Sequence, residues 1–268
     1  MRCRMPPTSL ERYAVVSCHV ERPLDDTVWE AFARLQERRP GGLAVAALIR
    51  PPDAEAGELD EQLWLARARE AAARGPVGHH THFTSPTHAR PTGGETGERV
   101  RREGVWLRER GVAATLFCGG GWYTDRSVAE ACAELGYVDC TPRATRPSYL
   151  PDDAAWAELS EPAVLRLDNP CNSLLQGSRL PAIPTTHAIG DLVRALARPG
   201  GLPDRVHAHF HDTDLLSPRR RALVTGSLVV LGRRRPAPDL DALRNEGRAA
   251  PEQAWESVAR GEAATGRT

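Results

Sequence analysis

The stretch DRSVAEACAELGYVDC, residues 125–140, decides the fold class of this chain. In its first part the apolar residues recur at three- and four-residue spacing: Val128, Ala131, Cys132 and Leu135. This spacing predicts a helix over 125–135 with one apolar face, and Thr124 or Asp125 is available as its N-cap. Gly136 can take the left-handed conformation that ends a helix, and the run 137–140 is typical of a buried strand.

The same order of helix, glycine and short apolar run occurs twice more, at 61–74, Gly75 and 76–78, and at 96–110, Gly111 and 112–117. Further strands are expected at 13–17, 43–49, 164–167 and 206–210, and further helices at 27–38, 189–197 and 219–231. About seven strands, most of them followed by a helix, predict an α/β fold. We expect an irregular (β/α) barrel of about seven parallel strands in a single domain.

Composition sets the limits of this domain. We expect residues 13–236 to form the barrel, after a flexible N-terminus at 1–12. From residue 237 to residue 268 we expect a polar C-terminal tail that can hold one helix. Two longer loops interrupt the alternation, at 84–97 and 142–160, and long loops in compact domains often carry function.

Charge and cysteine content exclude several classes of protein. The 268 residues include 35 basic and 35 acidic ones, every basic residue is Arg, and no block is basic enough to suggest nucleic-acid binding. The six cysteines form no CxxC pair, so we expect reduced, buried thiols. The N-terminus lacks the apolar core of a signal peptide, and no run reaches the ~18 apolar residues of a membrane span. We therefore expect a cytoplasmic protein without a membrane span.

The nine histidines are confined to four short stretches, three of which follow or end predicted strands: Cys18-His19-Val20, His79-His80-Thr81-His82 with His88, Thr186-His187, and His207-Ala208-His209-Phe210-His211. Imidazole is the commonest metal ligand and the usual proton carrier near neutral pH. Ligands of parallel α/β folds bind at the carboxyl ends of the strands. The pattern therefore predicts one polar site assembled from strand ends.

The first two stretches favour a metal or an acid/base pair. Because side chains alternate along a strand, His19 and Glu21 share one face. The alternative is a surface turn, since charged residues follow at once. An extended backbone also aims His80 and His82 at one point and turns His79 away, which suits a metal with an open coordination position. Here the alternative is a hydrogen-bonded loop.

The last strand places His207, His209 and His211 on one face, before Asp212 and Asp214. Three interior imidazoles would be costly unless they are paired, hydrated or bonded to a site. We expect His211 to lie near the mouth of the site as a catalytic or substrate-binding imidazole oriented by a carboxylate such as Asp212. For the other two histidines, a role in the site and a role in the core stay open.

Around the fourth strand, Gly119, Gly120 and Gly121 would let the backbone approach a ligand closely. Trp122 and Tyr123 then offer a flat surface on which a sugar ring can stack. The alternative is a tight turn packed by Trp122. We add His88, from the 84–97 loop, to Gly120, Trp122 and Tyr123 as candidate substrate-binding residues.

These motifs resemble the polysaccharide deacetylase superfamily, the NodB-homology domain of carbohydrate esterases, over roughly residues 13–235. Ser17-Cys18-His19-Val20-Glu21 is similar to the family's opening Ser-Phe-Asp-Val-Glu. His80-Thr81-His82-Phe83-Thr84 is similar to its His-Ser/Thr-x-x-His motif, with Thr84 in place of the second His. Phe210-His211-Asp212 resembles the late motif, whereas Cys118-Gly119-Gly120-Gly121-Trp122 stands at the third motif and lacks its Arg.

The resemblance implies an irregular (β/α) barrel that uses one divalent metal, zinc by preference. Glu21, His80 and His82 would hold the metal, His19 would stand at the position of the catalytic base, and His211 would assist the leaving group. The implied activity is the removal of an N-acyl group from an amino sugar or related glycoside.

Two other functions stay open. Gly78-His79-His80-Thr81-His82 also resembles the Gly-His-Thr-His of metallophosphoesterases, although the early Asp-x-His of that group is missing. Without an Asp at position 19 and a His at position 84, the chain could instead be an inactive, glycan-binding relative of the deacetylases. The oligomeric state is left open.

Overall fold

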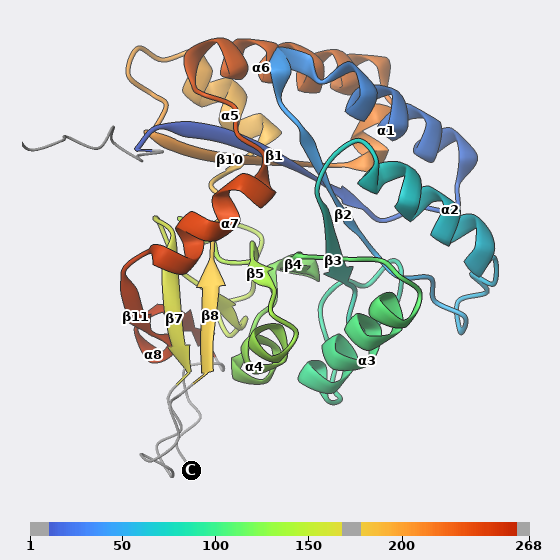
Figure 1. Cartoon of the computed structure of the whole chain (residues 1–268). Coiled ribbons are helices and arrows are strands. Elements are labelled where there is room, and N and C mark those ends of the chain that lie inside the picture. The colour runs from blue at the N-terminus through green and yellow to red at the C-terminus, as the bar shows by residue number, and fades with distance from the viewer. Residues whose placement is uncertain (1–10, 168–177, 262–268) are drawn as a thin grey trace, which may run out of the picture.

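Strands and helices alternate along most of the chain, as a computed structural model of residues 11–167 and 178–261 shows (Figure 1). The first part consists of β1 (Tyr13–Val20), α1 (Asp26–Arg38), η1 (Pro40–Gly42), β2 (Val45–Ile49), α2 (Glu61–Ala72), β3 (Val77–Thr81), α3 (Thr96–Glu109), β4 (Leu116–Gly119), η2 (Gly120–Trp122), α4 (Arg126–Glu134) and β5 (Val138–Asp139). The second part consists of β6 (Trp156–Ala157), β7 (Ala163–Leu167), β8 (Ser178–Ala182), β9 (His187–Ala188), α5 (Ile189–Leu196), β10 (Arg205–His211), η3 (Asp212–Leu215), α6 (Pro218–Arg234), α7 (Leu240–Ala249), β11 (Glu252–Ala254), α8 (Trp255–Val258) and β12 (Ala259–Arg260).

Local chemistry explains where several of these helices begin and end. The Asp125 side chain caps α4 by accepting a hydrogen bond from the amide of Val128, and Gly136 follows the helix with φ 66°. Gly111 likewise follows α3 with φ 74°. At Gly75 the prediction of a left-handed cap is wrong. A Cβ there would lie 3.0 Å from the carbonyl oxygen of Val45, so close packing accounts for this glycine.

The sheet has ten strands in the order β11-β7-β8-β5-β4-β3-β2-β1-β10-β9. As far as the described residues show, β7 and β8 form the one antiparallel pair within this sheet, and its other neighbouring strands are parallel. The prediction of a mostly parallel α/β sheet in one domain is therefore confirmed. The expected count of about seven parallel strands left out short or polar strands such as β8 and β11.

The sheet is not closed by strand pairing, so the expected closure is corrected here. Within the described ranges β11 and β9 are its two edge strands. The segment between β8 and β9 nevertheless contacts both the chain after β5 and the strand β10. The amide of Thr185 donates to the carbonyl of Pro142 after β5 (2.8 Å), and the amide of Thr186 donates to His207 in β10 (2.9 Å). This segment brings the end of β10 toward the end of β5.

One face of the central strands is apolar at its amino end and polar at its carboxyl end. On β1, Tyr13 and Val15 pack in a buried cluster with Leu48 and Leu116, whereas the following residues on the same face are Ser17, His19 and Glu21. We call this the inner face. The opposite face of β1 and β2 packs against apolar residues of α1, α2 and α6. On the inner face, the polar carboxyl ends of the strands therefore adjoin an apolar layer formed by their amino ends.

Beyond residue 236 the chain continues to form regular structure. The strand β11 lies beside β7 (Figure 1) and pairs with it in parallel, and β12 pairs with β6 in an antiparallel arrangement. Leu240 and Leu243 of α7 are buried in the same cluster as Tyr13. None of the helices within the described ranges is long and apolar enough to span a membrane.

Candidate functional site

Strand register places the predicted site residues on the inner face of four strands. Ser17 and His19 of β1 pair with His209 and His211 of β10, and His80 of β3 pairs with Cys118 of β4. The rings of His19 and His80 are 4.5 Å apart between centroids, and the rings of His19 and His211 are 5.2 Å apart. Histidines from distant parts of the sequence therefore meet at one place.

Three of the predicted residues, Glu21, His80 and His82, offer ligand atoms that lie within 4.8 Å of one another. The Nε2 atoms of His80 and His82 are 3.2 Å apart, and Nε2 of His82 is 3.4 Å from Oε1 of Glu21. Two ligand atoms that each lie about 2.0–2.1 Å from a tetrahedral zinc are about 3.4 Å apart. We call these three residues the Glu21 cluster, and their spacing fits a divalent metal.

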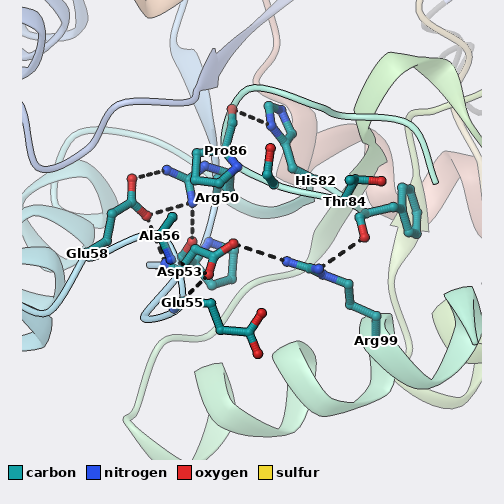
Figure 2. Close-up of polar contacts among 12 residues, drawn as sticks. Arg50, Asp53, Glu55, Ala56, Glu58, His82, Thr84, Pro86 and Arg99 are labelled. Carbon is teal, nitrogen blue, oxygen red and sulfur yellow. Dashed lines mark hydrogen bonds and ion pairs between the residues drawn. The ribbon is translucent and has the colours of Figure 1, made fainter. Parts of the chain in front are cut away.

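Backbone carbonyls fix which nitrogen of each imidazole faces this point. Nδ1 of His80 donates to the carbonyl of Cys118 (2.8 Å), and Nδ1 of His82 donates to the carbonyl of Pro86 (2.9 Å), as Figure 2 shows for His82. A carbonyl oxygen only accepts, so each Nδ1 carries a proton, and in the neutral form of each ring the lone pair of Nε2 points toward the other ring. This hydrogen bonding is typical of metal-binding histidines.

The charge states of the cluster also suit a metal. Burial lowers the pKa of His80 to about 3, and the neighbouring His82 adds to this effect, so the ring is neutral near pH 7. Burial alone would raise the pKa of Glu21, but the hydrogen bond with His82 and the nearby His211 and His80 lower it to about 2. Neutral imidazole and ionised carboxylate are the forms that bind metals.

Arg50, which follows β2, positions Glu21 and was not identified from the sequence. Its guanidinium, 3% exposed, donates to the backbone carbonyl of Glu21 through Nε (3.1 Å) and Nη2 (3.0 Å). Glu58 neutralises it through an ion pair, which Figure 2 shows beside the His82 segment. In the sequence, Arg50 is distinguished only by its position directly after a predicted buried strand. That position does not reveal which group the Arg side chain binds.

His19 lies next to the Glu21 cluster but is itself buried. Its Nε2 is 3.6 Å from Sγ of Cys118, and its ring is stacked on that of His209 and tilted against that of His80. Burial, together with the surrounding imidazoles, holds the pKa of His19 well below its usual value. His19, His80 and Cys118 form a second group of possible ligands. Because burial raises the pKa of the Cys118 thiol, its thiolate is scarce and this group suits a metal less well.

His211 lies between the Glu21 cluster and the solvent. Its Nε2 is 3.6 Å from Oε1 of Glu21 and its Nδ1 is 3.9 Å from Oδ2 of Asp214. The predicted partner Asp212 is fully buried, and its carboxylate accepts hydrogen bonds from the amides of Arg22 and Thr213. The structure thus places Asp214 beside the His211 ring and uses Asp212 to join η3 to the end of β1.

The predicted substrate-binding residues separate into different environments. The Trp122 ring is tilted against that of His19 (5.3 Å between centroids) and meets that of His209 edge to face (4.7 Å), and its backbone has the left-handed φ of 59°, which is uncommon for a large residue. Gly120 is buried against Thr81 and His82. Tyr123 points elsewhere and donates to Asp125 (2.6 Å), and His88 is exposed on a turn.

The remaining histidines have structural partners. Nε2 of His79 is 2.9 Å from the Glu103 carboxylate of α3, on the face opposite to the Glu21 cluster, as predicted. Nε2 of His207 is 2.9 Å from the Ser17 hydroxyl, and the ring is buried below the site. His209 is also buried, but it reaches the wall of a cleft. One of these two histidines thus belongs to the core and the other borders the site.

A cleft of about 1090 Å³ opens beside these residues, between the segment after β5 and the carboxyl end of β10. Trp122, His209 and His211 line it, together with Arg143 from the predicted 142–160 loop. The Glu21 cluster is not part of this lining. It lies beside the cleft, behind His211, and the Glu21 side chain is 26% exposed. A ligand in the cleft would therefore reach the cluster past Trp122 and His211.

No family model matches the chain, and no curated protein matches its sequence. It is similar to a 4-alpha-glucanotransferase from Thermococcus litoralis (15% identity, TM-score 0.47, 92% of this chain), of whose length it spans 40%. It is also similar to a family 4 carbohydrate esterase from Streptomyces lividans in complex with acetate (13%, 0.43), over 88% of this chain and 90% of that one. A candidate polysaccharide deacetylase of O-antigen biosynthesis from Bordetella bronchiseptica is similar as well (13%, 0.43), over 87% and 90% of the two chains.

Proposed function

We propose that the protein is a metal-dependent hydrolase that removes an N-acyl group, such as acetyl, from an amino sugar or a related glycoside. The observation that carries the proposal is the Glu21 cluster, in which two imidazoles with fixed tautomers and one ionised carboxylate converge within 3.2–3.4 Å. Because both Nδ1 atoms donate to backbone carbonyls, the two facing Nε2 atoms and the Glu21 carboxylate need a cation among them, either a proton on Nε2 of His82 or a metal ion, and a divalent metal would satisfy all three groups at once.

Glu21, His80 and His82 would hold the metal. When bound there, a divalent ion would polarise the acyl carbonyl and lower the pKa of a water molecule. Arg50 fixes the backbone of Glu21, and the Cys118 and Pro86 carbonyls fix the two rings, so the ligands are held in place before a substrate arrives.

His211 is the group we assign to proton transfer at the mouth of the site. It lines the cleft, its Nε2 lies 3.6 Å from Glu21, and Asp214 is beside its Nδ1. In this role it would protonate the leaving amine. The role of base that the family resemblance gives to His19 is kept as part of the proposal, although its Nε2 faces Sγ of Cys118 and the residue does not line the cleft.

The experiment measures metal content and acetate release with purified protein, using N-acetylated sugars as substrates. The wild type is expected to carry about one metal per chain and to lose its activity on chelation. A His80→Ala, His82→Ala variant should lose both metal and activity, whereas His88→Ala, which removes an exposed imidazole nearby, should keep the metal. A wild-type protein that binds no metal and stays inactive after reconstitution would overturn the proposal. Two metals per chain with turnover of a phosphate ester would indicate a phosphoesterase instead.

A further inference from the structure

The cleft beside the Glu21 cluster carries an excess of positive charge. Three carboxylates line it, and each has an arginine partner: Asp191 with Arg194, Glu161 with Arg205, and Asp214 with Arg220. Three further arginines also line it: Arg143, Arg146 and Arg198. Of these, Arg146 is bonded to Asp152 outside the lining, and Arg198 is exposed. The third, Arg143, is the one whose environment calls for an explanation.

Arg143 is a buried cation at the wall of the cleft. Only 5% of the residue is exposed, and its guanidinium carbon lies 4.4 Å above the Trp122 ring. Within the described ranges no carboxylate lies within 4.0 Å of it, and its buried Nε has no hydrogen-bond partner. The charge of Asp191 acts on the guanidinium from farther away, and that carboxylate is bonded to Arg194. A buried, unpaired charge is costly, so such a group is typical of a site that a counter-charge completes.

Among the residues that the structure describes, the Arg143 side chain has one polar contact, and it does not compensate for this burial. Its Nη1 is 3.3 Å from Nδ1 of His209, but the same Nδ1 is 3.1 Å from the carbonyl oxygen of His187. If Nδ1 donates to that carbonyl, it carries a proton and cannot accept from Arg143. A single ring nitrogen can serve one of these partners and not both. The guanidinium therefore keeps free donors that face the cleft.

We propose that Arg143 binds an anionic group of the substrate, a carboxylate or a phosphate, in this cleft. The neighbouring rings indicate where that group would lie: the guanidinium carbon of Arg143 is 4.4 Å from the Trp122 ring, whose centroid is 5.3 Å from that of His19. An anion on Arg143 would place the rest of a small glycoside along Trp122 and His211, toward the Glu21 cluster. The inference rests on the proposed function for the acylated sugar, and it adds that this sugar is acidic. The planar fork of Arg suits both anions, so their common charge is what the site recognises.

The test compares three sugars that differ only at carbon 6: N-acetylglucosamine, its 6-phosphate, and the corresponding uronic acid. Binding is measured by titration calorimetry on the full chain after metal removal, so that neither turnover nor a metal-bound anion contributes. At least one of the two acidic sugars is expected to bind about tenfold or more tightly than the neutral one. The tighter of the two then identifies the anion.

Arg143→Gln should remove this preference, and Arg198→Gln, which removes the same charge from the exposed rim, should change it less than about threefold because water screens that position. Arg143→Lys keeps the charge but not the fork and should weaken the binding of the acidic sugar several-fold. Equal binding of all three sugars by the wild type, no binding of either acid, or a preference that survives in Arg143→Gln would overturn the proposal. None of these results depends on whether acetate is released, so the two proposals fail separately.

Discussion

At Gly120 the backbone of η2 passes so close to β3 that no side chain fits. A Cβ there would lie 2.6 Å from the carbonyl oxygen of Thr81 and 2.9 Å from the His82 ring. The residue was expected to admit a substrate. Its surroundings show a packing role, since the missing side chain leaves room for one of the three candidate metal ligands.

Gly120→Ala should therefore push the His82 ring away from His80. Overpacking of this kind costs about 1–3 kcal/mol of stability, and displacing a ligand lowers metal affinity by about 10–100-fold. Both are measurable, by denaturant unfolding and by titration with zinc. The matched control is Gly226→Ala, in the interior of α6 with no atom within 4 Å of the new Cβ, which should add up to about 1 kcal/mol of stability and leave zinc binding unchanged. If Gly120→Ala binds zinc like the wild type, the contact with His82 does not position the ligand.

Among the elements, the strands with a clear period were predictable and those defined by distant partners were not. The alternation in β1 and β10 correctly placed His19, Glu21 and His211 on one face, because a strand reverses its side chains at every residue. By contrast, β8 contains Pro181, which argues against a strand when only the sequence is read.

In the candidate site, too, some features were predictable from the sequence and others were not. The convergence of Glu21, His80 and His82 follows from strand ends that meet at one edge of a sheet. The contacts of Arg50 and Arg143 join segments that are distant in the sequence, and no residue spacing along the chain predicts these contacts. Roles that depend on such contacts require the fold to be known.

The strand β5 carries a buried carboxyl group that should make stability depend on pH. Burial raises the pKa of Asp139 to about 6 from an ordinary value near 3.8, although the hydrogen bonds with Thr141 act against the rise. Between these two pH values the folded protein holds a proton that the unfolded chain has released. The free energy of unfolding therefore falls as the pH rises from about 4 to 6, and the loss is complete above that range.

Asp139→Asn removes this titration. The difference in the free energy of unfolding between the wild type and the variant therefore isolates the contribution of Asp139 to the pH dependence. At about 1.4 kcal/mol per pH unit, the wild type should lose up to roughly 3 kcal/mol relative to the variant between pH 4 and pH 7. Urea unfolding at several pH values measures the two curves. Parallel curves would mean that Asp139 titrates normally and that water or another group reaches its carboxylate in the folded state.

On the scale of the whole molecule, residues 240–260 complete two parts of the core. Leu243 of α7 is 1% exposed in the cluster with Tyr13 of β1, and Trp255 of α8 is 1% exposed in the cluster with Leu165 of β7. The helices α7 and α8 thus share buried clusters with β1 and with β7, respectively. A segment built in this way cannot unfold by itself without opening the core.

Trp255→Ala should accordingly cost about 3–5 kcal/mol, and Leu243→Ala about 2–5 kcal/mol, and both variants should still unfold in a single transition. Urea unfolding followed by fluorescence and by circular dichroism measures the cost and tests whether the two signals change together. Leu59→Ala, at a side chain that is 77% exposed, should stay within about 0.5 kcal/mol of the wild type. An early, separate transition in Trp255→Ala would contradict a shared core, because it would show that the C-terminal segment detaches while the sheet with the Glu21 cluster stays folded.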